Sequence, residues 1–325
     1  MTDESRRPRV LITSWIVRED DPALDVLRTA GCEIVFRRRP SFRDEAEMLE
    51  IIGGAHGVVA ASDAYTERVL SAGPLRVISR VGVGYDSVDV AAATARRIAV
   101  TTTPGANNES VADHTFALIL TLARQVLPQD RDMRAGKWTR LTAADVHGQT
   151  LGILGLGKIG KGVARRARGF DMRVVAYDPI WDDTFAAAHA VVPLPLDEVI
   201  RQADFLTLHL PATPQTRQLI DARCLALMKP TAYLVNAARG SLVDEAALFD
   251  ALSSRRIAGA GLDVFDREPP WGSRLVGLEN VVVTPHVAGF SVRANEAAVR
   301  MAIENVVLVL QGNRPHFCVN PEVFE

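Results

Sequence analysis

The sequence predicts an α/β protein made of two doubly wound domains, each built on a parallel sheet. Short runs of apolar and β-branched residues alternate with segments of helical periodicity. This alternation is typical of parallel sheets that carry helices on both faces. The alternation starts again at Thr150, and the 325 residues suffice for two domains of roughly 150 residues each.

The first series occupies about the first third of the chain. Its strands are expected where β-branched residues cluster, and its helices where apolar residues recur every three or four positions. The expected strands are 10–12, 33–36, 57–60 and 76–78, and the expected helices are 22–30, 43–52 and 66–72.

The second series has more strands and the same alternation. Its expected strands are 151–154, 173–177, 205–209, 232–236, 259–263 and 281–284. Its expected helices are 158–168, 196–202, 221–228 and 244–252.

Two long helices are expected between and after the series, at 108–127 and 295–310. Few residues follow the second helix, so we expect the chain to cross into the second domain and return at its end. This interpretation places 1–104 and 293–325 in a flavodoxin-like domain and 105–292 in the other domain.

A glycine-rich turn follows the first strand of the second series. Gly155-Leu156-Gly157-Lys158-Ile159-Gly160 has the spacing G-x-G-x-x-G. The first glycine permits a tight turn, the second lets backbone approach a pyrophosphate, and the third allows close helix packing. The helix that follows presents unpaired N–H groups to phosphates. The second domain is therefore predicted to be a Rossmann dinucleotide-binding domain.

Asp178 lies 18 residues after the third glycine, at the end of the second strand of this series. An acid about 20 residues beyond the motif is typical of a ribose-binding carboxylate. A carboxylate there repels a 2′-phosphate, which favours NAD over NADP. The alternative is that Asp178 only starts a turn before Pro179.

Three polar side chains follow strands of the second series. Arg239, Glu268 and His286 come after the predicted strands 232–236, 259–263 and 281–284. Ligands bind beyond the carboxyl ends of strands in open parallel sheets, so these residues are predicted to converge. The alternatives are a loop-capping arginine, a solvated loop acid and a buried structural histidine.

Several ordered motifs carry a resemblance to a known family. They are the stretch 151–160, Tyr177-Asp178-Pro179, 236–240, Leu262-Asp263-Val264-Phe265 with Glu268-Pro269, and Thr284-Pro285-His286. Over roughly residues 55–320, their order and spacing resemble the D-isomer-specific 2-hydroxyacid dehydrogenases, most closely the phosphoglycerate dehydrogenase branch.

The resemblance implies a role for each part. Arg239 would bind the substrate carboxylate and polarise its carbonyl, His286 would be the general acid/base, and Glu268 would be its partner. Histidine suits this role because it exchanges protons near neutral pH. The first domain would bind substrate and the second NAD. Further contacts are implied for the cofactor at His209, Pro211, Thr216, Ala237 and Asp263, and for the substrate at Arg80, Val83, Gly84, Asn107 and Arg140. The stretch 80–84 is alternatively a plain glycine turn, and Asn107 a helix cap.

The substrate itself is less sharply defined. Phosphoglycerate-specific relatives tend to carry Val-Arg-Ser where this chain has Ala60-Ala61-Ser62, although Arg80 and Arg140 resemble other basic positions of that branch. We expect NAD-dependent interconversion of a D-2-hydroxy acid and its 2-oxo acid, with 3-phosphoglycerate favoured. The alternatives are a glyoxylate- or hydroxypyruvate-type dehydrogenase and a non-catalytic NAD(H)-sensing regulator. Glu268 disfavours formate dehydrogenase, whose branch has glutamine there.

Composition excludes several classes of protein. A net charge of −2 argues against nucleic-acid binding, and no apolar stretch is long enough for a membrane helix. The start, MTDESRRPR, lacks the apolar core of a signal peptide, and three scattered cysteines predict neither disulfides nor a metal site. We therefore expect a cytoplasmic protein and, from the resemblance, a homodimer.

Overall fold

A computed structural model describes residues 7–39 and 42–325, which form two compact units. One unit comprises the described residues up to Asn107 together with Ser291–Glu325, and the other comprises Asn108–Phe290. The start of the chain, on which the signal-peptide prediction depends, falls mostly on residues 1–6, outside the described residues.

The first unit is built on a five-stranded parallel sheet in the order β2-β1-β3-β4-β5. This is the flavodoxin-like order. Its strands are β1 (Arg9–Ile12), β2 (Glu33–Phe36), β3 (Gly57–Ala60), β4 (Val77–Arg80) and β5 (Ala99–Thr101). Its helices are α1 (Leu24–Thr29), α2 (Glu45–Ile51), α3 (Glu67–Leu70), α4 (Val90–Ala95) and α12 (Val292–Leu310), and η4 (Pro321–Phe324) is a 3₁₀ turn.

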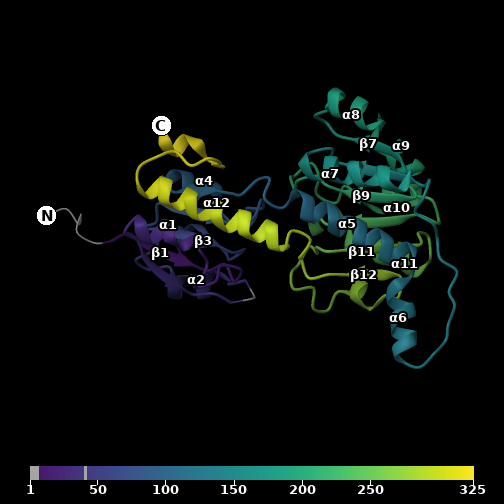
Figure 1. The fold of residues 1–325 in the computed structure, drawn as a ribbon, viewed down its shortest axis with the longest axis horizontal. Coiled ribbons are helices and arrows are strands. Elements are labelled where there is room, and N and C mark those ends of the chain that lie inside the picture. The colour runs from purple at the N-terminus through teal and green to yellow at the C-terminus, as the bar shows by residue number, and fades with distance from the viewer. Residues whose placement is uncertain (1–6, 40–41) are drawn as a thin grey trace. The chain divides into compact units, whose positions relative to one another are not determined.

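Both faces of this sheet are buried, because neighbouring residues of a strand point to opposite sides. Val58 packs in the cluster that includes α2, α3 and α4, whereas Val59 packs in the cluster that includes α1 and α12. Figure 1 shows α12 running beside α1 and the strands of this unit. The doubly wound prediction is thus confirmed for the first unit.

The segment after α12 covers the edge strand β5. Residues Thr101 and Cys318 form an antiparallel bridge, and the Val319 amide donates to the Val100 carbonyl at 2.8 Å. Buried Asn320 accepts from the Val100 amide at 2.8 Å and donates to the Ile98 carbonyl at 2.9 Å. These bonds satisfy edge groups that would otherwise be open to pairing with another chain.

The second unit is built on a seven-stranded parallel sheet in the order β12-β11-β10-β9-β6-β7-β8. Six of these strands have the Rossmann order, and β12 extends the sheet. The strands are β6 (Thr150–Leu154), β7 (Arg173–Tyr177), β8 (Val191–Pro193), β9 (Phe205–Leu208), β10 (Tyr233–Asn236), β11 (Gly259–Leu262) and β12 (Val281–Val283).

Helices cover both faces of this second sheet. Leu154 and Leu206 pack with the cluster that includes α9, α10 and α11, whereas Ile153 and Phe205 pack with the cluster of α5, α7 and α8. The helices are α5 (Asn108–Ala123), α6 (Val126–Arg134), α7 (Lys158–Ala167), α8 (Asp183–His189), α9 (Leu196–Gln202), α10 (Ala222–Leu227) and α11 (Glu245–Ser253). The 3₁₀ turns are η1 (Arg168–Phe170), η2 (Gly240–Leu242) and η3 (Arg274–Gly277).

The predicted helix 108–127 was too long, because the structure ends α5 at Ala123 and begins α6 at Val126. Gln125 lies between them in the left-handed region, with φ 51°. A continuous helix would have brought the ring of Pro128 against the carbonyl of Arg124. The break places Pro128 in the first turn of α6, where its missing N–H costs nothing.

The sequence analysis also missed four short elements: β5, β8, α4 and α8. β5 and β8 have three residues each, and α4 and α8 have six and seven. Periodicity needs a longer window than these elements offer.

Candidate functional site

The glycine-rich turn connects β6 to α7, and two of its glycines are required by packing. Gly155 has φ +99°, and a Cβ there would lie 2.6 Å from the carbonyl carbon and oxygen of His209. A Cβ on Gly160 would lie 2.0 Å from the Gly155 oxygen. By contrast, no atom lies within 4 Å of a Cβ built on Gly157. The second glycine therefore faces open space at the amino end of α7, next to exposed Lys158 and half-buried Ile159.

Asp178 follows β7 and is bound to the glycine-rich turn. Its Oδ2 accepts a hydrogen bond from the Leu156 amide at 2.6 Å, and its Oδ1 accepts from the Ile180 amide at 2.7 Å. The bond to Ile180 is the turn predicted as the alternative role. A carboxylate has about four acceptor positions, so both bonds leave capacity for hydroxyl donors.

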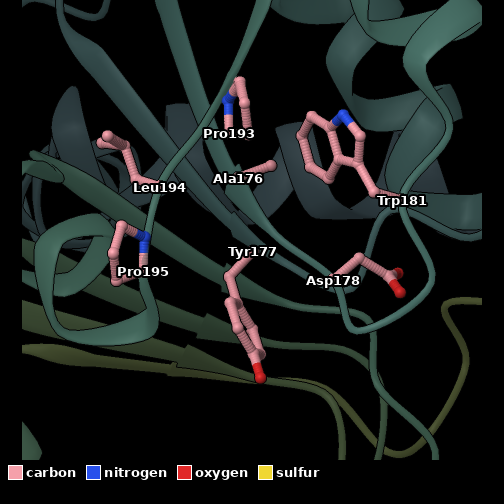
Figure 2. Close-up of a pocket in the computed structure, with 7 residues that line it drawn as sticks. All are labelled: Ala176, Tyr177, Asp178, Trp181, Pro193, Leu194 and Pro195. Atoms are coloured by element: carbon pink, nitrogen blue, oxygen red, sulfur yellow. The ribbon is translucent and has the colours of Figure 1, made fainter.

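A cavity of about 300 Å³ opens beside Asp178, at the carboxyl ends of β7 and β8. Figure 2 shows its lining, which includes the indole of Trp181 and the rings of Pro193 and Pro195. Sequence reasoning missed these residues. The available signal was their position at the carboxyl ends of two neighbouring strands, β7 and β8, but β8 was itself missed. The complete lining is Ala176, Tyr177, Asp178, Trp181, Pro193, Leu194 and Pro195.

The loop after β9 packs directly on the glycine-rich turn. The His209 amide donates to the Leu154 carbonyl at 2.7 Å, and His209 Nε2 lies 3.0 Å from the Thr207 hydroxyl. Burial lowers the pKa of His209 to about 3, so its imidazole is neutral at pH 7. Its Nδ1 is buried and has no hydrogen-bond partner within residues 7–39 and 42–325. The Thr216 hydroxyl donates to the Pro211 carbonyl at 2.7 Å and closes this loop.

Arg239, Glu268 and His286 follow three neighbouring strands, β10, β11 and β12. The Arg239 turn, which begins at Ala237, is braced by Asn236, whose Nδ2 donates to the Arg239 carbonyl at 2.8 Å. Arg239 Nη1 donates to the Ala238 carbonyl at 2.7 Å. The next residue, Gly240, lies so close to the segment preceding Glu268 that a Cβ would fall 1.8 Å from the Phe265 carbonyl carbon.

Glu268 and His286 form a hydrogen-bonded pair. His286 Nδ1 lies 2.7 Å from Glu268 Oε2, and Glu268 Oε1 accepts from the Phe265 amide at 3.1 Å. The His286 side chain is 41% exposed and the Glu268 side chain is 21% exposed, so the pair is open to a ligand. An ionised carboxylate only accepts, so Nδ1 is the donor to Glu268 and Nε2 is the ring nitrogen left for a ligand. The predicted pairing of these residues agrees with this geometry.

Asp263 organises the turn that carries His286. Its Oδ1 accepts from the Thr284 hydroxyl at 2.6 Å and from the Val287 amide at 2.9 Å. Its Oδ2 accepts from the Ala288 amide at 2.9 Å. The carboxylate, which is 1% exposed, is therefore engaged by its own domain. The cofactor contact that the sequence analysis assigned to Asp263 stays a prediction.

The residues assigned to the substrate belong to both units. Arg80 is buried in the first unit, where Nε donates to the Gly84 carbonyl at 3.1 Å and Nη2 to the Ser62 hydroxyl at 2.7 Å. It therefore joins two loops, 60–62 and the Val83-containing loop 81–84. Asn107 ends the same unit and has a buried Oδ1, whereas Arg140 lies exposed in the second unit with its guanidinium 5.9 Å from the Trp138 ring centroid. Their contacts with substrate stay predictions.

Within the part of the chain that the structure describes, no group of three His, Cys, Asp or Glu residues is placed to hold a metal ion. Across the same residues, no helix is both long and apolar enough to cross a membrane.

Comparison with known proteins identifies the family. Residues 116–288 match the model of the D-isomer specific 2-hydroxyacid dehydrogenase, NAD binding domain. A glyoxylate reductase of Korarchaeum cryptofilum is 44% identical over 270 residues, which are 81% of this chain and 81% of that protein. The chain belongs to the D-isomer-specific 2-hydroxyacid dehydrogenases. It is an NAD-dependent oxidoreductase that acts on a CH–OH group.

Two further matches to this D-2-hydroxyacid dehydrogenase include a solved structure that supports the fold and the cofactor. A D-3-phosphoglycerate dehydrogenase of Mycobacterium bovis is 42% identical over 273 residues, which are 83% of this chain and 52% of that protein. The crystal structure of D-lactate dehydrogenase from Aquifex aeolicus, complexed with NAD and lactic acid, matches with a TM-score of 0.84 and 28% identity. That match covers 96% of this chain and 99% of the other. The predicted fold class, family and cofactor are thus confirmed.

Proposed function

We propose that His286 is the general acid/base of this dehydrogenase, that Glu268 orients it and that Arg239 binds the substrate carboxylate. The observation that carries this proposal is the 2.7 Å contact between His286 Nδ1 and Glu268 at the carboxyl end of the sheet. The close packing of Gly240 on Phe265 supports it, because that packing holds the Arg239 turn beside the segment that leads to Glu268.

In the oxidative direction, His286 Nε2 accepts the proton of the C2 hydroxyl as the C2 carbonyl forms. Glu268 stabilises the resulting imidazolium and holds the tautomer that leaves Nε2 unprotonated beforehand. The planar guanidinium of Arg239 matches a carboxylate with two parallel hydrogen bonds, which orients C2. Bound NAD⁺ supplies the acceptor for the hydride that leaves C2. In reduction the same proton returns from His286 to the carbonyl oxygen.

The glycine-rich turn, Asp178 and the adjacent cavity are proposed to hold NAD. Gly157 has open space at the amino end of α7, which suits a pyrophosphate. Asp178 is fixed by two backbone amides beside a cavity lined by Trp181 and prolines, which suits a ribose and a flat adenine ring. Neutral His209 and the loop closed by Thr216 border the same turn. The second unit therefore takes the NAD-binding role, and the first unit the substrate-binding role.

Two classes of substrate are candidates. 3-Phosphoglycerate is the first, because the motifs resemble that branch and a D-3-phosphoglycerate dehydrogenase is among the relatives. A small unphosphorylated acid of the glyoxylate or hydroxypyruvate type is the second. It is favoured by Ala61, which supplies no cation, and by Arg80, whose Nε and Nη2 are bonded to Gly84 and Ser62.

The test is a steady-state screen of NADH formation and consumption with 3-phosphoglycerate, glycerate, D-lactate, hydroxypyruvate and glyoxylate. The Ala61→Arg variant is assayed in parallel and Ala61→Leu is its control for size. If the natural substrate lacks phosphate, Ala61→Arg raises kcat/KM for 3-phosphoglycerate about tenfold, as one charge-assisted hydrogen bond would. Turnover of none of these acids by the wild-type protein would contradict the proposed function.

A homodimer and a cytoplasmic location are also proposed. The dimer is supported by apolar side chains exposed on α6 and the loop after it: Val126, Leu127, Met133 and Trp138 are 48%, 52%, 54% and 73% exposed. The location is supported by three cysteines without disulfides, as expected in a reducing compartment. Sedimentation at micromolar concentration tests the dimer, and a stable monomer would refute it. Cell fractionation tests the location.

A further inference from the structure

We propose that His114 is a positioning residue for the reaction, acting through Thr284 and Asp263 to hold the turn that carries His286. The inference rests on the proposed role of His286 as acid/base. His114 lies on α5, 170 residues away from Thr284 in sequence. No motif of the glycine-rich turn or of the three catalytic candidates includes it.

The hydrogen bonds have one consistent direction. Asp263 Oδ1 only accepts, so the Thr284 hydroxyl donates its proton to it at 2.6 Å. The Thr284 oxygen can then only accept from His114, whose Nε2 lies 3.0 Å away. His114 must therefore carry a proton on Nε2. The result is a hydrogen-bonded series from α5 through Thr284, the residue after β12, to Asp263, the residue after β11.

This hydrogen-bonded series ends at Asp263, which holds the turn that carries His286. The carboxylate of Asp263 binds the amides of Val287 and Ala288, and the His286 amide donates to the Asp263 carbonyl at 2.8 Å. His286 itself has φ +54°, a left-handed conformation that non-glycine residues rarely adopt. Such a conformation persists only where the surroundings fix it. The hydrogen bonds of Asp263 provide these surroundings, and His114 fixes the orientation of the Thr284 hydroxyl that bonds to Asp263.

The arrangement of α5 supports this role. α5 packs against β11 and β12, and Figure 1 shows it beside these strands. His114 is partly buried, with 20% of its side chain exposed. It therefore contributes a hydrogen bond at a place where water competes weakly. A helix held by Leu118 against Gly261 keeps this donor at a fixed position relative to Asp263.

The experiment compares two pairs of variants with one control. His114→Leu removes the donor, and His114→Gln keeps an N–H near the position of Nε2. Thr284→Val removes the hydroxyl, and Thr284→Ser keeps it. Thr115→Val is the matched control, because the Thr115 hydroxyl bonds to the Val111 carbonyl of its own helix. Thermal unfolding and NADH titration are measured for each variant.

The two donor-deleting variants should lower kcat roughly 3- to 10-fold, the effect of one hydrogen bond, with the KM for NADH within twofold of wild type. His114→Gln and Thr284→Ser should recover most of the loss. Thr115→Val should leave kcat unchanged. An unchanged kcat in His114→Leu, no recovery in His114→Gln, or a loss confined to the KM for NADH would each overturn the proposal.

A double variant separates this inference from the proposed function. If His114 acts through His286, His114→Leu lowers the residual kcat of a His286→Asn enzyme no further. An equal loss in both backgrounds would overturn the positioning role while His286 remains the acid/base. Near wild-type activity of His286→Asn alone would instead defeat the proposed function, whatever His114→Leu does.

Discussion

Two groups of loops at the same end of the second sheet differ in how far they depend on close backbone packing. The glycine-side loops, 155–157, 178–181 and 209–216, follow β6, β7 and β9. Close backbone approach at Gly155 joins the first loop to the third, and the side chains of Asp178 and Thr216 add hydrogen bonds to backbone groups. The histidine-side loops, 237–240, 263–268 and 284–288, follow β10, β11 and β12 and depend on side-chain hydrogen bonds from Asn236, Asp263 and Glu268. Within the histidine-side loops, Gly240 packs on the backbone of Phe265 as closely as Gly155 packs on that of His209.

Under the proposed roles, this difference assigns cofactor binding and proton transfer to different loops at one edge of the sheet. A backbone cradle has few adjustable parts, so it presents the same surface to a cofactor whatever the substrate. Side-chain networks can reorient a titratable group, and they fail when one donor or acceptor is lost. Substitutions that add a methyl group should therefore damage the first group, and substitutions that remove a polar atom should damage the second.

The largest effect is expected from His286→Asn, which removes the proton acceptor without changing the backbone cradle. We expect kcat to fall about 10²- to 10⁴-fold, the usual contribution of a general acid/base. The dissociation constant for NADH, measured by fluorescence titration, should change less than threefold. A variant with both activity and cofactor affinity near wild type would remove the distinction between the two groups.

Gly160→Ala and Gly157→Ala form a matched pair within the glycine-side loops. Gly160→Ala forces a Cβ to 2.0 Å from the Gly155 oxygen and should cost about 3 kcal/mol of unfolding free energy. Gly157→Ala meets no neighbour within 4 Å, so its unfolding free energy should change by less than about 1 kcal/mol. Both should weaken NADH binding. Urea denaturation of each variant measures the difference, and equal destabilisation would contradict the packing argument.

Acid should weaken the glycine-side loops through His209. Burial lowers its pKa to about 3 in the folded protein, so the unfolded chain binds the proton more tightly. The stabilisation is complete above the unfolded value near 6.5 and is lost as the pH falls toward 3, by about 2 kcal/mol at pH 5.

Urea denaturation at pH 7 and pH 5 checks this contribution, because His209→Gln should remove it. The control is His147→Gln, at a histidine whose side chain is 75% exposed, and it should leave the pH dependence in place. An identical pH dependence in His209→Gln and wild type would show that the loop is not sensitive to acid at this residue.

The smallest effect is expected from Glu268→Gln in the histidine-side loops. The amide can still bond to His286, but it does not stabilise the imidazolium, so kcat should fall about tenfold. The KM for NADH should stay near the wild-type value. Steady-state kinetics in both directions measure this split, and a change confined to the KM for NADH would place Glu268 with the cofactor instead.

Sequence alone predicted the two sheets, the glycine-rich turn and the pairing of Glu268 with His286. The sheets and the turn follow from local patterns, whereas the pairing was expected from the resemblance to the family. The His114–Thr284 bond could not be predicted, because it depends on the packing of α5 against β12. The bonds by which Arg80 joins two loops could not be predicted either, because the spacing of residues in a sequence does not reveal what a buried guanidinium contacts.

The segment from Ser291 onward, which completes the first unit, has a consequence for biosynthesis. α12 and the Asn320 contacts belong to a unit whose five strands all precede residue 108, while the second unit is continuous from Asn108 to Phe290. During translation the inserted unit has its whole sequence available first. The first unit is complete only after α12 has left the ribosome. Until then the backbone groups of β5 that bond to Val319 and Asn320 have no partner. Nascent chains stalled shortly after residue 290 should therefore be the form most in need of a chaperone.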